Sequence, residues 1–228
     1  MQNHRKLWLS SSLALLIHGF SMANPLPSQA VIVYKANLGG FPVGEATQRW
    51  TLNNGRYELN TELRPILGPD IRYQSTGDVT EKGLKPSDYA EFRSRNKQPR
   101  TQAKFDWDKQ EVTYGKTESL QTGKLSIGAQ DLNALPFQLS WLGSKPAPVM
   151  QVMTGRKLRE DHFKEAAPNK LTLMGKSHTT RVWISPDGTE ATEIWLAPTL
   201  GNLPVKIIRH DDKGELQLVA KTIEYQLD

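Results

Sequence analysis

The fold is decided by the stretch Val43–Leu63, which reads VGEATQRWTLNNGRYELNTEL. Both halves alternate between apolar and polar residues, which is the period of a strand with one buried face. Between them lies Asn53-Asn54-Gly55, and Asn and Gly tolerate the positive φ of a tight turn. In the second half Tyr57, Leu59, Thr61 and Leu63 share one face. The stretch therefore predicts an antiparallel β-hairpin.

The same alternation continues on both sides of this hairpin. We expect further strands at residues 30–38, 71–80, 87–95, 100–107 and 111–116, and again from Val149 to the C-terminus. Turn residues separate these segments, and no repeat of fixed period is visible. This pattern predicts a mainly β protein, built as a single antiparallel, strongly curved sheet or an incomplete β-barrel.

The alternation of apolar and polar residues stops over residues 128–142, which read GAQDLNALPFQLSWL. Leucines recur there at helical spacing, and Asp131 can cap the first turn. Pro136 lacks a backbone donor and clashes with the preceding turn, so we expect two short helical pieces. The curved sheet is expected to wrap this helical segment.

The N-terminus has the layout of a cleavable export signal. Arg5 and Lys6 precede the mostly apolar run 7–20, and the small residues Ser21 and Ala23 follow. The run is too short and too polar for a spanning helix, and no cysteine is present to carry a lipid anchor. We expect cleavage after Ala23, a single β-rich domain over residues 24–228, and a periplasmic location without a membrane-spanning segment.

Composition restricts the function classes further. Loss of Arg5 and Lys6 leaves 27 basic and 24 acidic residues, and this net charge of +3 does not indicate a nucleic-acid partner. The absence of cysteine excludes disulfides and thiol chemistry. A chain of this length can bury a sufficient core without them.

Catalytic and metal-binding motifs are missing from the sequence. No Gly-x-Ser-x-Gly elbow occurs, and the histidines do not fall in metal-ligand spacing, so neither a cofactor nor a metal is expected. One enzymatic alternative is a glycan hydrolase, which needs two carboxylates across a cleft. The acids available for it are Asp106, Asp108, Asp131 and Glu193.

Aromatic and basic side chains are the candidate ligand contacts. Large aromatics usually fill a β core, but on a concave face they can line a pocket for an acyl chain or a sugar. The stretch 93–104 carries five positive charges and no acid, which suits an anionic partner or simply an exposed hairpin. The candidate ligand-binding residues are Trp107, Phe137, Trp141, Trp183, Trp195, Arg93, Arg95 and Arg100.

Several short segments together resemble the exported bacterial family of domain of unknown function 3108. They are YKANLGGFPVG at 34–44, Gly83-Leu84 with Pro86, Phe105-Asp106-Trp107, Gln130-Asp131-Leu132, and Ile194-Trp195-Leu196 with Leu203-Pro204-Val205-Lys206. The resemblance covers nearly all of the chain after the export signal. It implies a periplasmic β-rich domain and carries over no catalytic residue.

Together these observations favour a non-enzymatic binding module for a lipid, a glycan or another envelope component. Export, paired apolar strand faces and the missing catalytic motifs are its basis. An alternative is a scaffold that presents a sheet edge or a hairpin to an envelope protein. The glycan hydrolase is the third hypothesis.

Overall fold

The computed structural model describes residues 26–143, 145–146, 149–185, 191–211 and 214–227, so the expected export signal lies outside the described residues. Most of the described residues lie in strands, and one α-helix and one short 3-10 helix occur among them. The elements are β1 Gln29–Leu38, β2 Phe41–Asn53, β3 Arg56–Pro65, β4 Ile71–Thr80, β5 Gly83–Arg93, β6 Thr101–Asp106, β7 Glu111–Lys116, β8 Ser119–Lys124, β9 Gln130–Asp131, α1 Leu135–Leu142, β10 Val149–Met153, β11 Leu158–His162, β12 Lys164–Leu173, β13 Lys176–Ser185, β14 Thr192–Ala197, η2 Pro198–Leu200, β15 Leu203–Asp211 and β16 Gly214–Gln226.

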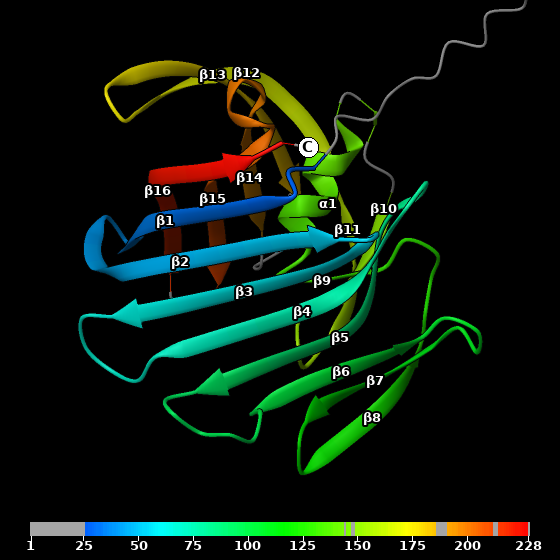
Figure 1. Cartoon of the computed structure of the whole chain (residues 1–228). Helices are drawn as coiled ribbons and strands as arrows, with labels where there is room; N and C mark the ends of the chain where they lie inside the picture. The colour runs from blue at the N-terminus through cyan, green and yellow to red at the C-terminus, as the bar shows by residue number, and fades with distance from the viewer. Residues whose placement is uncertain (1–25, 144, 147–148, 186–190, 212–213, 228) are drawn as a thin grey trace, which may run out of the picture.

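Thirteen strands form one antiparallel sheet in the order β12-β13-β14-β15-β16-β1-β2-β3-β4-β5-β6-β7-β8. The pairing of β16 with β1 joins the two ends of the chain inside the sheet. The sheet curls round without closing, and β8 and β12 remain at its two edges (Figure 1). The predicted mainly β, strongly curved and incomplete barrel is therefore confirmed.

The hairpin over 43–63 has the register that its alternation predicts. Trp50 lies opposite Leu59, and Asn53 lies opposite Arg56. Asn54 and Gly55 have φ of 50° and 76°, the conformation that a two-residue turn between twisted strands requires. Because side chains of a strand alternate between faces, Tyr57 and Leu59 both enter the core.

The helix α1 lies inside the curl of the sheet (Figure 1) and fills it. Phe137 stacks on Trp50 of β2 with ring centroids 4.6 Å apart, whereas Leu135 and Leu139 pack among the residues of β13–β15 and β10. The helix therefore buries apolar side chains against both halves of the sheet.

The helical segment is shorter than predicted. Residues before Leu135 form turns and the short strand β9, and a single helix follows in place of two pieces. Pro136 lies in the first turn of α1, where its missing N–H would have no partner within the helix in any case, so it does not break the helix. Strand β8 was not predicted from the sequence. Its residues SLQTGK are exposed almost throughout, so they show no apolar face.

Polar side chains hold the helix segment to the sheet. Gln138 Oε1 accepts the backbone N–H of Leu84 at 2.7 Å, and Gln130 Nε2 donates to the carbonyl of Leu84 at 2.8 Å. On the other side, Asn202 Nδ2 donates to the carbonyl of Ser140 at 2.6 Å. Because all these residues are buried, each bond satisfies a group that water cannot reach.

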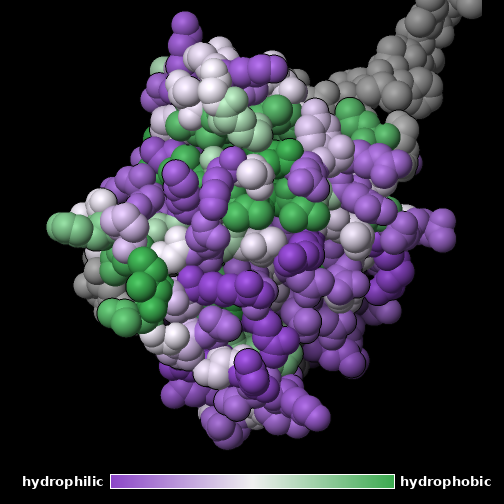
Figure 2. Space-filling model, turned by 60° about the vertical axis from the view of Figure 1, so that its left-hand side comes forward, coloured by the Kyte–Doolittle hydropathy of each residue, from purple (hydrophilic) through white to green (hydrophobic). Residues whose placement is uncertain are grey.

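The surface is mainly hydrophilic on the face that Figure 2 presents, with apolar residues gathered in its upper half and in a second group at the left. No helix among the described residues is long and apolar enough to cross a bilayer.

Candidate functional site

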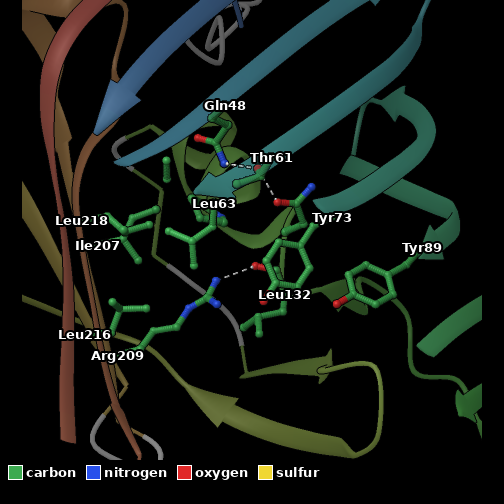
Figure 3. A pocket seen from close by; sticks show the side chains of 13 residues that line it. Gln48, Thr61, Leu63, Tyr73, Tyr89, Leu132, Ile207, Arg209, Leu216 and Leu218 are labelled. Atoms are coloured by element: carbon green, nitrogen blue, oxygen red, sulfur yellow. Dashed lines mark hydrogen bonds between the residues drawn. The ribbon is translucent and has the colours of Figure 1, made fainter. Parts of the chain in front are cut away.

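A cavity of about 50 Å³ lies inside the curl of the sheet, between strands β2–β5 on one side and β15–β16 on the other (Figure 3). The segment that leads into α1 forms a further wall. A buried water needs roughly 10–15 Å³ of such volume, so the cavity accommodates a few waters or one small polar group. Its lining is Ala46, Gln48, Thr61, Leu63, Tyr73, Tyr89, Leu132, Asn133, Pro136, Ile207, Arg209, Leu216 and Leu218.

One wall of the cavity is a chain of buried amide and hydroxyl groups. Gln48 Nε2 donates to Thr61 Oγ1 at 3.2 Å, and Thr61 Oγ1 donates to Asn133 Oδ1 at 2.7 Å. Asn133 Nδ2 in turn donates to the carbonyl of Leu59 at 3.1 Å. These bonds join β2, β3 and the segment before α1, and they fix the position of this wall.

The chain of hydrogen bonds extends to Tyr34 on β1. Its hydroxyl lies 3.0 Å from Gln48 Oε1 and 2.8 Å from the carbonyl of Pro204. Complete burial raises the pKa of the Tyr34 phenol above its usual value, so the hydroxyl stays neutral. Tyr34 thereby links β15 to the same wall.

Asp131 is a fully buried carboxyl group next to this network. Its Oδ1 accepts the backbone N–H groups of Asn133 and Ala134, both at 2.9 Å, and its Oδ2 accepts Ser75 Oγ at 2.5 Å. Desolvation raises the pKa of Asp131 to about 6, and the three hydrogen bonds oppose that rise. The expected capping role is displaced by one turn, because Asp131 holds the turn before α1 and not the first turn of the helix.

The opposite side of the cavity is cationic and apolar. The guanidinium of Arg209 lies on the side of Tyr73 and Leu132 in Figure 3, and its Nη2 donates to the carbonyl of Leu132 at 3.4 Å. Burial raises the pKa of the Tyr73 phenol, and the positive charges of Arg209, Arg93 and Arg100 oppose this rise. The charge of Glu91, which pairs with Arg93, adds to the rise of the Tyr73 pKa.

Two of the three arginines predicted as ligand contacts, Arg93 and Arg100, lower the pKa of Tyr73 through their charge. Arg93 Nε lies 2.7 Å from Glu91 Oε1, and Arg100 is exposed at the start of β6. Arg95 is exposed in the turn between β5 and β6. All three thus belong to the same end of the sheet.

The predicted aromatic residues are not gathered at one place. Phe137 and Trp183 are buried in the core, which separates them from solvent. The four tryptophans lie on separate elements, and each has a cation over its ring: Lys85 with Trp107, Lys145 with Trp141, Arg181 with Trp183, and Lys206 with Trp195. Such pairs contribute about 0.5–1 kcal/mol at exposed sites and do not by themselves mark a ligand site.

Trp107 differs from the others because it borders two surface hollows of about 470 and 500 Å³. Its Nε1 donates to the carbonyl of Pro86 at 2.7 Å, and its ring stacks on Phe105 with centroids 6.1 Å apart. The indole is therefore held in one orientation at the surface, beside Lys85. These hollows lie at the opposite end of the strands from the turn between β5 and β6.

The acids considered for hydrolysis lie on different elements. Asp106 pairs with Lys109 at 3.0 Å near the end of β6, and Glu193 on β14 accepts Trp195 Nε1 at 3.1 Å. Asp131 is enclosed by its donors. No cluster of three metal-ligating side chains occurs in the part of the chain that the structure describes.

Sequence reasoning did not identify Arg209, Tyr73 or the leucines of β16 as cavity residues. Arg209 lies in the run KIIRH, where an arginine follows two apolar residues, and Leu216 and Leu218 alternate as in any strand. Their convergence depends on the pairing of β16 with β1, which brings the C-terminal strands beside the N-terminal ones.

Comparison with known proteins shows to which family a chain with this architecture belongs. The model of the family DUF3108, described as a protein of unknown function, matches residues 33–221. The chain belongs to the DUF3108 family. No curated protein matches the sequence significantly.

Solved structures resemble the fold of this DUF3108 protein at low sequence identity. A β-barrel-like protein of domain of unknown function DUF1849 from Brucella abortus superposes with a TM-score of 0.57 at 8% identity, over 88% of this chain and 99% of that one. A putative outer membrane lipoprotein-sorting protein domain from Vibrio parahaemolyticus gives a TM-score of 0.26 at 10% identity, over 87% and 86% of the two chains. The first likeness supports the β-barrel-like fold, and the second is too weak to carry an argument.

Proposed function

We propose that this DUF3108 protein is a non-enzymatic binding module whose ligand combines an apolar part with a small anionic group. The observation that carries the proposal is the composition of the cavity, where the guanidinium of Arg209 lies among leucine side chains. A charged group in such surroundings interacts strongly with an anion, because little water competes. The ligand class is an envelope lipid or a similar amphiphile.

Size and rigidity define the expected mode of binding. The cavity suits a carboxylate or phosphate group, since pockets for whole drug-sized ligands usually reach about 300–1,000 Å³. The apolar part of the ligand would lie along the half-buried Leu63, Leu216 and Leu218. The hydrogen-bonded wall of Gln48, Thr61 and Asn133 would be preorganised for this ligand.

Export to the periplasm is part of the same proposal. Its support is the order of charge, apolar run and small residues over 1–23, which precedes the fold and lies outside the described residues. Fractionation of cells that express the full chain would test it, with N-terminal sequencing of the exported form expected to begin at Asn24.

A matched pair of probes tests the binding proposal. Dansylaminoundecanoic acid offers a carboxylate and an apolar chain, and its primary amide keeps the chain without the charge. We expect the exported protein to bind the acid, and Arg209→Gln to lower that affinity at least tenfold, because a charge-assisted hydrogen bond contributes about 1.5–3 kcal/mol.

The control is Arg49→Gln, at an exposed position of β2 outside the cavity. It should bind both probes as the parent protein does, and Arg209→Gln should keep the parent affinity for the amide. Absence of binding to the acid, or equal loss for acid and amide, would contradict the proposed role of Arg209.

The surface at Trp107 supports a second candidate function, the binding of a glycan. A fixed, half-buried indole between two hollows offers a flat face on which a sugar ring can stack. Titration with soluble peptidoglycan fragments, followed by tryptophan fluorescence, would test it. Binding that survives Trp107→Ala would exclude this surface.

A further inference from the structure

Three hairpin turns form one rim of the sheet: residues 38–41 between β1 and β2, 65–71 between β3 and β4, and 93–101 between β5 and β6. The backbone N–H of Ile66 donates to the carbonyl of Val43 at 2.8 Å, and that of Ser94 donates to the carbonyl of Asp70 at 2.7 Å. Arg72 adds a hydrogen bond to the carbonyl of Asn96 at 3.2 Å. The three turns, at the left in Figure 1, therefore form one continuous surface, the hairpin rim.

The hairpin rim exposes large apolar side chains. Phe41 is 76% exposed, Ile66 is 69% exposed and Leu67 is 88% exposed. Phe41 follows the turn Gly39-Gly40, and Ile66 and Leu67 form the tip between Pro65 and Gly68. Several exposed apolar residues on adjacent turns are typical of a site of interaction with a protein or a membrane.

Basic residues lie beside the tip that carries Ile66 and Leu67. The segments 64–72 and 93–100 hold six lysines and arginines against a single acid, Asp70. Arg64 pairs with Glu62 at 2.9 Å and Arg93 with Glu91 at 2.7 Å, whereas Arg95, Lys97 and Arg100 are exposed. The turn 38–41 contains no charged residue at all. The hairpin rim is thus apolar at its tips and positive beside them.

We propose that the hairpin rim docks the protein onto the surface of an anionic lipid bilayer. Phe41, Ile66 and Leu67 would enter the boundary between head groups and acyl chains, and Arg95, Lys97 and Arg100 would contact lipid phosphates. Interfacial segments with apolar and basic residues side by side bind bilayers in two ways that add up. The apolar residues bury surface among the lipids, and the basic residues are attracted to anionic head groups. A bilayer fits better than a protein, because the exposed apolar residues lie at the tips of two turns and exposed basic residues lie on the neighbouring turn.

The lining of the cavity extends toward the same end of the sheet. Leu63 in its lining precedes the turn 65–71 by two residues, and Leu216 pairs with Leu38 at the turn 38–41. Figure 2 turns this end of the molecule toward the viewer. A docked protein would hold the cavity near the lipid head groups, although the docking itself requires no ligand in the cavity.

Vesicle flotation tests the docking with the exported protein. Vesicles of phosphatidylethanolamine and phosphatidylglycerol at 3:1 are compared with vesicles of phosphatidylcholine alone. We expect binding to the anionic vesicles only, and a loss of at least tenfold in the double variant Ile66→Ser with Leu67→Ser. The matched control is Ile127→Ser, which is 78% exposed beside the turn between β4 and β5 at the opposite end of the strands.

A second pair of variants tests the charges. Each Lys or Arg near an anionic surface contributes about 1 kcal/mol, which is about fivefold in partitioning. We therefore expect Arg95→Ala with Lys97→Ala to lower binding on the order of thirtyfold at low salt. Lys82→Ala, at the opposite end, should bind as the parent protein does.

The orientation is tested with an environment-sensitive fluorophore, which is straightforward because the chain contains no cysteine. NBD attached to Leu67→Cys should shift to shorter wavelength on anionic vesicles, whereas NBD on Ile127→Cys should not. Equal shifts at both positions, unchanged binding in the rim variants, or binding to an envelope protein but not to vesicles would overturn the proposal.

Discussion

Replacement of Asp131 by asparagine is the sharpest test of how this protein is held together. The carboxyl group is fully buried, and desolvation raises its pKa from 3.8 to about 6. The folded protein therefore holds a proton on Asp131 at pH values where the unfolded chain has lost it. By linkage, the contribution of Asp131 to stability is fully present below about pH 4 and is lost as the pH rises through about 6.

The magnitude follows from the two pKa values. Their difference corresponds to about 3 kcal/mol of unfolding free energy, lost between about pH 4 and pH 6. In Asp131→Asn, the new amide oxygen can accept the N–H groups of Asn133 and Ala134, and the new amide nitrogen can donate to Ser75 Oγ. The substitution should therefore keep the contacts, remove the charge, and raise stability at pH 7.5 by about 1–3 kcal/mol.

Urea unfolding followed by tryptophan fluorescence between pH 4 and pH 8 measures the effect. The difference in unfolding free energy between Asp131→Asn and the parent should grow in favour of the variant between about pH 4 and pH 6 and stay constant above that. Asp108→Asn, at an exposed turn, is the matched control and should follow the parent curve. Parallel curves for Asp131→Asn and the parent, or a marked loss of stability at pH 7.5, would refute the reasoning and indicate that the structure requires the ionised carboxylate.

Three further substitutions test the core. Phe137→Ala removes the ring that stacks on Trp50 inside the sheet and should lower the unfolding free energy by about 3–5 kcal/mol, seen as a lower thermal midpoint. Tyr34→Phe leaves the carbonyl of Pro204 without its donor and should cost about 1–3 kcal/mol in urea unfolding, with native circular dichroism retained. Gly77→Ala places a Cβ 2.7 Å from Pro86 Cα, so it should destabilise by about 1–3 kcal/mol; an unchanged midpoint would show that β4 and β5 separate easily there.

The strands are predictable from sequence where one face is buried. The hairpin over 43–63 follows from its alternation and its Asn-Gly turn, and the structure reproduces both. Strand β8 escapes prediction because its side chains are exposed on both faces, so no alternation marks it. The leucine spacing locates the helix in the correct region but gives the wrong start, because it does not show that Asp131 holds a turn and that Pro136 lies in the first turn of the helix.

The candidate site is predictable only in part. Charge alone points to Arg93, Arg95 and Arg100, and they do lie at one end of the sheet. Size alone points to the tryptophans, and the structure distributes them over separate elements. Arg209 and Tyr73 are 136 positions apart in sequence, and nothing local relates them.

The sequence alone determined the curved antiparallel sheet, the family and the helical insert, because alternation and turn residues act over a few neighbouring positions. Only the tertiary structure decided that α1 fills the curl, that a small cavity remains beside Arg209, and that the exposed apolar turns lie next to the basic ones. These features arise from the pairing of β16 with β1 and from the register of successive hairpins, which bring together residues that are distant along the chain.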